Sequence, residues 1–251
     1  MRCVVICKGC GLERILCRAH VVGRGVARYI MVGAKHNLQI SDDAVKPTLH
    51  GIYDDNILCN ECDNKLGQFD DCGVRVIRRF AAEHKLEGEI FSLEEVNGDL
   101  FSKFILAIIW RSSISTRPEF DSFNVGPYEK TIHKILLGGE ELATFPAIQI
   151  LLARYRITKL FNPSLMFSLP EHKRGSNVNF VCFALCGFRI SVKLDKRPWP
   201  SLNREIVKDF SINGNGALKG TTVDFLGSGE HCSIEDMLRA QSFRQARSKS
   251  F

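Results

Sequence analysis

Apolar and polar positions follow two different periodicities along the chain. Residues 60–84 repeat apolar side chains at approximately helical spacing, which predicts a helix although its glycines weaken it. Residues 98–113 are apolar on almost every side and predict a largely buried helix. Residues 177–194 alternate and bend around Gly187, which is the pattern of a strand or hairpin in the core of a sheet. Helices and strands together predict an α+β protein.

Shorter runs and turn residues supply the other predicted elements. Residues 147–155 are apolar and short, so strand and helix both remain open, and residues 23–53 have no clear pattern. The remaining predictions are short strands at 2–7 and 15–22, a helix over 127–137 opened by Pro127, a flexible turn at 213–216, and a final helix over 233–245 with Ser233 as its N-cap.

The composition is that of a globular protein. The chain has 251 residues, of which 45% are hydrophobic and 25% charged, so it can bury a sizeable core. No apolar run reaches the ~18 residues needed to span a bilayer, and the N-terminus is too short and too rich in cysteine for a signal peptide. Ten cysteines without a secretory signal indicate a reducing compartment. We therefore expect a cytoplasmic protein with no membrane partner.

Two cysteine pairs are the most specific motif. Cys7-Lys-Gly-Cys10 and Cys59-Asn-Glu-Cys62 each place two thiolates two residues apart. Together they supply the four soft ligands of a closed tetrahedral zinc site. Gly11 suits a zinc-knuckle turn, in which backbone amides approach sulfur closely. We expect a structural zinc ion that joins these segments, so that removing it unfolds this part of the chain.

A second zinc assignment competes with the first. Cys7, Cys10, Cys17 and His20 form a Cys3His set within a short stretch. This set would leave the Cys59-x-x-Cys62 pair without a metal, and it would occupy His20. We therefore favour the two-pair assignment, with Cys17 as a strand residue of a small core.

Metal-ligand spacing is confined to the first third of the chain. The sequence therefore predicts two regions, a zinc-binding module over residues 1–84 and a larger mixed α/β region over residues 85–251. No motif in the second region names a reaction. We expect it to serve recognition or assembly.

The first region resembles the HNH, or ββα-metal, nuclease superfamily in its zinc-binding branch. The resemblance rests on the first cysteine pair, on Ala19-His20-Val21-Val22, and on the stretch from Asp55-Asn56-Ile57-Leu58 through the second cysteine pair to Lys65. It covers roughly residues 3–80. It implies a small ββα-metal module and a divalent-metal-dependent endonuclease.

The resemblance also assigns roles to individual residues. His20 matches the general base that deprotonates the attacking water, and Asn56 matches the residue that fixes the loop orienting that base. Asp63 matches the helix residue that binds the catalytic ion, and a carboxylate there suits Mg²⁺ or Mn²⁺. Asp70 lies seven residues further along the helix, on the same face, as a second ligand or a partner of the site.

The sequence departs from the family pattern at one position, so a catalytically inactive site remains an alternative. The position before the base is often a metal ligand in the family, but here it is Ala19. The alternative is a catalytically inactive, zinc-stabilised nucleic-acid-binding module. A further alternative is a protein-interaction component of a larger complex, with a protein partner or a second copy of the chain.

Charge distribution favours a polyanionic partner. The formal net charge is +6, and arginines cluster around the cysteine pairs. Arg18, Arg24 and Arg78 are candidates to face phosphates of a nucleic acid, which we expect to be DNA. By resemblance, the biological setting is phage defence, restriction or a mobile element.

Overall fold

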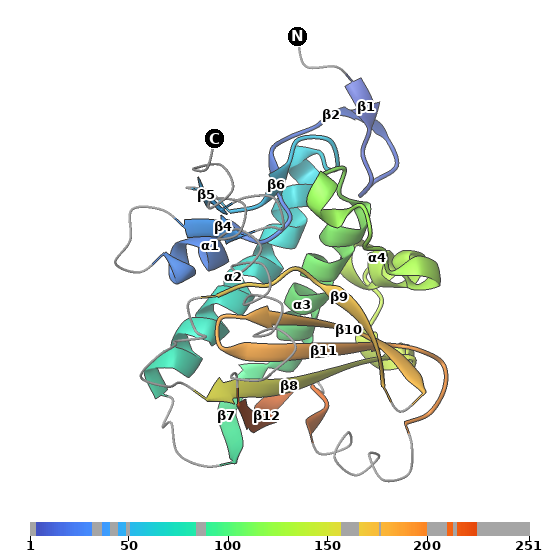
Figure 1. The fold of residues 1–251 in the computed structure, drawn as a ribbon. Helices are drawn as coiled ribbons and strands as arrows, with labels where there is room; N and C mark the ends of the chain where they lie inside the picture. The colour runs from blue at the N-terminus through green and yellow to red at the C-terminus, as the bar shows by residue number, and fades with distance from the viewer. Residues whose placement is uncertain are drawn as a thin grey trace, which may run out of the picture.

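The computed structural model confirms the α+β class. It describes residues 4–31, 37–40, 45–48, 51–83, 89–156, 166–175, 177–199, 210–212 and 215–224. Figure 1 shows a broad sheet whose strands lie between residues 90 and 224, with helices packed behind and beside it, and small strand pairs at the end nearer the N-terminus. No helix within these described ranges is long and apolar enough to cross a membrane.

A six-stranded sheet is the centre of the fold. All neighbouring strands run antiparallel except β12 and β8, which are parallel. In spatial order the strands are β7 (Ile90–Asn97), β12 (Asn215–Asp224), β8 (Ile148–Arg156), β11 (Phe188–Leu194), β10 (Val178–Leu185) and β9 (Glu171–Gly175).

The predicted hairpin at residues 177–194 is confirmed as β10 and β11. Cys186 and Gly187 both have positive φ values, 50° and 91°, as a tight two-residue hairpin turn requires. Residues 181–185 of β10 are all buried. This burial on both faces explains why polar positions are few in this part of the sequence.

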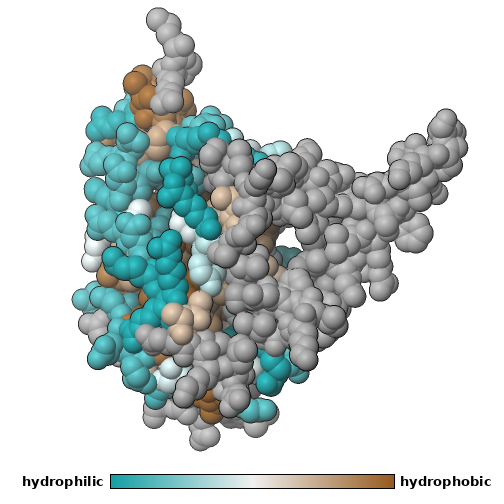
Figure 2. Space-filling model, turned by 90° about the vertical axis from the view of Figure 1, so that its left-hand side faces the viewer, coloured by the Kyte–Doolittle hydropathy of each residue, from teal (hydrophilic) through white to brown (hydrophobic). Residues whose placement is uncertain are grey.

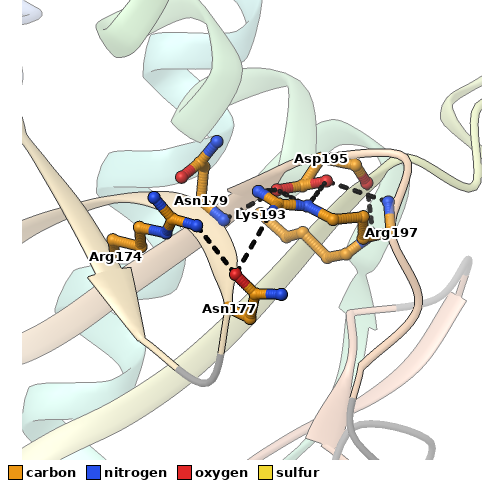
Figure 3. A network of polar contacts seen from close by, with 6 residues as sticks. All are labelled: Arg174, Asn177, Asn179, Lys193, Asp195 and Arg197. Atoms are coloured by element: carbon orange, nitrogen blue, oxygen red, sulfur yellow. Dashed lines mark hydrogen bonds and ion pairs between the residues drawn. The ribbon is translucent and has the colours of Figure 1, made fainter.

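A polar network closes the other end of this hairpin (Figure 3). The Asp195 carboxylate accepts hydrogen bonds from Arg197 and from the backbone N–H of Asn179. Asn177, which has a positive φ of 62°, accepts from both Arg174 and Arg197. Hydrogen bonds from Arg197 and Asn179 hold the pKa of Asp195 well below its usual range. The network therefore joins the β9–β10 turn to the end of β11.

Within the described residues, four α-helices accompany the sheet. The apolar helix α3 is buried along most of its length, and the Asn97 side chain caps it by accepting from the Leu100 N–H at 2.9 Å. It packs against α2 and also contacts β7 and β12. The α-helices are α1 (Arg24–Ile30), α2 (Asn60–Glu83), α3 (Gly98–Ile114) and α4 (Glu129–Leu137).

The N-terminal segment forms three short antiparallel pairs. Their bounds are β1 (Val4–Ile6) with β2 (Glu13–Ile15), β3 (Ala19–His20) with β6 (Tyr53–Asp54), and β4 (Asn37–Ile40) with β5 (Val45–Thr48). The β1–β2 hairpin carries exposed apolar side chains, among them Val4 and Ile6, each 60% exposed. Figure 2 shows a brown patch at the top of the molecule, at the height of the β1–β2 hairpin.

The hydrophobic core is continuous across the predicted boundary at residue 84. Phe80 of α2 packs against Phe188 of β11, with ring centroids 4.1 Å apart, and against Phe91 of β7 at 5.3 Å. One cluster of buried residues extends from Cys7 to Leu218. The two predicted regions therefore share a single core among the described residues.

The structure confirms the two long helices and corrects several shorter elements. Helix α4 begins at Glu129, after a 3-10 turn at Gly126–Tyr128, and the segment predicted at 147–155 forms the strand β8 (Ile148–Arg156). The predicted strands at 2–7 and 15–22 are shorter, and α1, β4 and β5 occupy the segment without a clear pattern. Residues 215 and 216 belong to β12, so that part of the predicted turn is wrong. The predicted helix over 233–245 lies outside the described residues.

Candidate functional site

Four cysteines from two distant segments meet at one end of the molecule. The sulfur atoms of Cys7, Cys10, Cys59 and Cys62 all lie within 4.8 Å of one another. The first pair lies on the turn of the β1–β2 hairpin, and the second lies where α2 begins. Backbone hydrogen bonds join the segments, from the Lys8 N–H to the Ile57 carbonyl and from the Cys17 N–H to the Leu58 carbonyl, both 2.9 Å. These four cysteines could hold a metal ion.

The surroundings of the sulfurs fit a metal ion. Cys7 Sγ accepts backbone N–H groups from Gly9 at 3.3 Å and from Cys59 at 3.2 Å. Burial raises the pKa of Cys7, but backbone hydrogen bonds outweigh burial and lower it to about 7. Burial raises the pKa of Cys62, and the neighbouring cysteines add to this effect. A divalent cation would compensate this crowding of negative charge.

The glycine that the knuckle needs is Gly9 rather than Gly11. A Cβ atom on Gly9 would lie 2.7 Å from Cys62 Sγ, so any other residue would displace the sulfur. Gly11 has a positive φ of 70° and no neighbour within 4 Å of such an atom, so its role is the turn.

Cys17 and His20 are not part of this sulfur group. Among the described residues, the four cysteines are the only set of three or more such ligands that converge within 4.8 Å. Burial and the nearby Asp63 raise the pKa of the Cys17 thiol to about 11. The structure therefore supports the two-pair assignment over the Cys3His set.

A cavity of about 200 Å³ lies beside the cysteine group and collects several predicted site residues. Asp63 and Asp70 lie two turns apart on one face of α2, as their spacing predicts, and His20 reaches the cavity from β3. The lining residues are His20, Arg24, Gly25, Asp63, Gly67, Asp70, Asp71 and Val74.

Burial in the cavity shifts the pKa values of two of its lining residues, His20 and Asp63. Burial lowers the pKa of His20, and the positive charge of Arg111 lowers it further. The imidazole is therefore neutral near neutral pH. Burial raises the pKa of Asp63, against the opposing effect of Arg111. A neutral imidazole thus lines the same cavity as a carboxylate whose pKa is raised.

Asp70 is already paired, and its partner was missed in the sequence. Arg111 of α3 donates from Nη1 to Asp70 Oδ2 at 2.8 Å and from Nη2 to Asp70 Oδ1 at 2.6 Å. Arg111 is only 1% exposed. Burial lowers its pKa, but Asp70 outweighs this effect and raises it. The sequence held a signal, because an arginine inside an apolar helix needs an acidic partner.

Asn56 lies on the loop between β6 and the second cysteine pair and does not line the cavity. Its backbone N–H donates to Asp54 Oδ1 at 2.8 Å, and its Nδ2 donates to Thr116 Oγ1 at 3.4 Å. Asp54 is 2% exposed and also accepts from Ser115 Oγ at 2.8 Å and from the Thr116 N–H at 2.6 Å. Sequence reasoning missed Asp54, which fastens this loop to the end of α3.

The three predicted phosphate-facing arginines differ in position. Arg24 lines the cavity, whereas Arg18 stacks over the Tyr53 ring, 3.3 Å from its centroid. Arg78 is exposed further along α2. Ala19 is fully buried and pairs with Asp54 across the β3–β6 ladder, so it brings no ligand to the cavity.

Comparison with known proteins adds no relative. No protein-family model, curated protein or solved structure matches this chain. Any functional conclusion must therefore come from the residues and their geometry.

Proposed function

We propose that this protein is a divalent-metal-dependent endonuclease that hydrolyses phosphodiester bonds of DNA. In this proposal β3, β6 and α2 form an HNH-like ββα-metal module. The observation that carries it is that His20 and Asp63, which are far apart in the sequence, line one cavity together with Arg24. A base, an acidic ligand and a cation are the groups that phosphodiester hydrolysis requires.

Each residue has a defined task. The neutral imidazole of His20 accepts the proton of the attacking water, and the Asp63 carboxylate holds a Mg²⁺ or Mn²⁺ ion. Such an ion would polarise the scissile phosphate and stabilise the leaving oxygen. Arg24 binds a phosphate at the cavity, with Arg18 and Arg78 as contacts to the flanking backbone. Asn56 keeps the loop before α2 in place through its bonds to Asp54 and Thr116.

The four-cysteine group holds a structural zinc ion in this proposal. A closed set of four thiolates leaves no position for substrate, so the ion stabilises the β1–β2 turn and the start of α2. Its cysteines would stay reduced in the cytoplasm, the predicted location. No disulfide joins the cysteines that the structure describes.

Cleavage assays test the proposal. Zinc-loaded protein would be mixed with plasmid, linear duplex, single-stranded DNA and RNA, each with Mg²⁺, Mn²⁺ or EDTA. His20→Ala and Asp63→Ala are compared with Lys65→Ala, an exposed residue of α2 outside the cavity. We expect metal-dependent cleavage of DNA that both site variants lose and the control keeps. Cleavage that survives in EDTA, or in both site variants, would contradict the proposal.

A nucleic-acid-binding protein without catalysis is the second candidate. Two observations favour it, because Ala19 contributes no ligand and Arg111 occupies both oxygens of Asp70. Such a protein would bind nucleic acid with an affinity that falls steeply with salt and does not respond to Mg²⁺. Binding of the wild type without cleavage under any metal would establish this function instead.

A further inference from the structure

The Arg111–Asp70 pair joins α3 to the wall of the cavity. Arg111 is the charged residue near the end of the apolar helix α3, and its side chain is almost completely buried. Its Nε donates to the Ala107 carbonyl at 3.2 Å, while Nη1 and Nη2 both donate to Asp70. Each guanidinium nitrogen therefore has an acceptor. Such bidentate, charge-assisted pairs are among the strongest polar contacts in proteins.

The Asp70 carboxylate is also held from its other side. A Cβ atom on Gly23 would lie 2.7 Å from Asp70 Cγ, so the turn that follows β3 packs directly against this carboxylate. Asp70 nevertheless lines the cavity with Asp63, and its side chain is 13% exposed. It is therefore near enough to take part in metal binding but is fixed in a different contact.

We propose that Arg111 is a positioning residue that withholds the Asp70 carboxylate from the divalent ion of the cavity, leaving Asp63 as the carboxylate ligand. This inference rests on the proposed function for the existence of that ion. It replaces the expectation that Asp70 is itself a ligand.

The energetic reason is the burial of Arg111. A metal ion that recruited Asp70 would break two short hydrogen bonds and leave a buried guanidinium without its acidic partner. An uncompensated buried charge is strongly destabilising. The Arg24 and Asp71 side chains also line the cavity, but neither is buried. Arg111 is thus the group that decides whether Asp70 joins Asp63 at the ion.

Manganese binding to the full-length, zinc-loaded protein tests this directly. Mn²⁺ alone is titrated and the free ion is measured by electron paramagnetic resonance. Removing the guanidinium in Arg111→Met frees a second carboxylate, so the dissociation constant is expected to fall about tenfold, since affinity rises with the number of charged ligands. Arg111→Lys can occupy only one oxygen of Asp70 and is expected to lie between the two.

The double variant Arg111→Met with Asp70→Asn removes both charges. We expect it to bind Mn²⁺ within about threefold of the wild type, because Asp70 is not a ligand there. Asp55→Asn is the matched control, since it removes an exposed carboxylate that does not line the cavity. Equal binding by the wild type and Arg111→Met would overturn the proposal, as would a loss of more than about tenfold in the double variant.

Two further readouts keep this inference separate from the endonuclease proposal. Zinc content and circular dichroism establish that each variant is folded. If Arg111→Met does not fold, the double variant tests the proposal alone, and a loss of Mn²⁺ affinity of more than about tenfold would overturn it. A wild type that binds Mn²⁺ but cuts no DNA would refute the nuclease and leave this inference standing. Mn²⁺ binding by Arg111→Met but not by the wild type would also support it. Absence of binding in both proteins would overturn it.

Discussion

The four-cysteine group and the cavity beside it are built in different ways. The cysteine group draws its four sulfurs from two short motifs, and Cys7 Sγ receives hydrogen bonds from the backbone of both motifs. The cavity takes His20 from β3 and Asp63 from α2, but the charges and loops around it are held by residues of α3 and the segment after it. One site is fixed locally, and the other depends on the whole fold.

This difference between the two sites explains what α3 and the segment after it contribute. Arg111 holds Asp70, while Ser115 and Thr116 hold the buried carboxylate of Asp54. These contacts cross the predicted boundary at residue 84 and belong to one continuous core. Residues 85–251 therefore form part of the support of the candidate site, in addition to any recognition role.

The largest effect is expected from removing a cysteine. Cys59→Ser would abolish metal binding and unfold the β1–β2 turn and the start of α2, because metal binding is coupled to folding at such sites. Metal content by mass spectrometry and thermal unfolding by circular dichroism measure this. Cys17→Ser is the control and keeps the metal, since its sulfur is outside the group. Full metal content in Cys59→Ser would contradict the role of Cys59 as a metal ligand of the four-cysteine group.

Asp54 provides a test of the support of the cavity. Its hydrogen bonds from Thr116 and Asn56 outweigh burial and hold its pKa below the usual value. Asp54→Asn is expected to lower the free energy of unfolding by about 2–3 kcal/mol at neutral pH. Because the folded pKa is lowered, this stabilisation is complete above the pKa of an unfolded Asp, ~3.9, and disappears as the pH falls through the folded value.

Urea unfolding of both proteins at neutral and acidic pH measures the effect of Asp54. The difference in the free energy of unfolding between the wild type and Asp54→Asn should become smaller at acidic pH. Asp55→Asn is the matched control, because Asp55 is exposed and its change should have little effect. A gap that widens in acid would show that the pKa of Asp54 is raised instead.

Substitutions at two glycines of α2 distinguish the effect of packing on stability from the effect of helix propensity. A Cβ atom on Gly73 would lie 2.2 Å from the Phe104 ring, so Gly73→Ala should destabilise the protein by about 1–3 kcal/mol through strain between α2 and α3. Gly67 has nothing within 4 Å of that position, so Gly67→Ala should stabilise it by about 0.5–1 kcal/mol. Chemical denaturation compares them. Equal changes in the free energy of unfolding for the two variants would contradict the close contact between α2 and α3.

The smallest effect concerns a hydrogen bond between α4 and the cysteine turn. His133 Nε2 lies 2.6 Å from the Gly9 carbonyl, with the imidazole N–H as donor. His133→Ala should lower the free energy of unfolding by about 1 kcal/mol and speed zinc loss to a chelator only modestly. Lys134→Ala, at an exposed position, is the control. Complete zinc loss in His133→Ala would show that the cysteine group is not locally fixed.

The sequence predicted those features that depend on local pattern. Helix α2 and the buried helix α3 follow from their periodicity, and the four-cysteine group follows from the spacing of its pairs. The pairing of His20 with Asp63 in one cavity was expected only from a family resemblance. Both residues line the same cavity, and their catalytic roles stay a prediction.

The features that the sequence did not reveal are long-range. Asp70 meets Arg111 across 41 positions, and Asp54 meets Thr116 across 62. No periodicity encodes such a meeting, because it depends on how α2, α3 and β6 pack. Strand β12 was also missed, since its Gly, Thr and Lys residues have weak strand patterning and gain their order from β7 and β8.

Chemical rescue tests the role of His20 most directly. Plasmid nicking with Mn²⁺ would be measured for the wild type and for His20→Ala of equal zinc content, with and without imidazole in solution. We predict that the variant loses about 100-fold or more in rate, as expected for a general base, and that imidazole restores part of it. Undiminished nicking by His20→Ala, or a wild type that never cuts, would contradict the account.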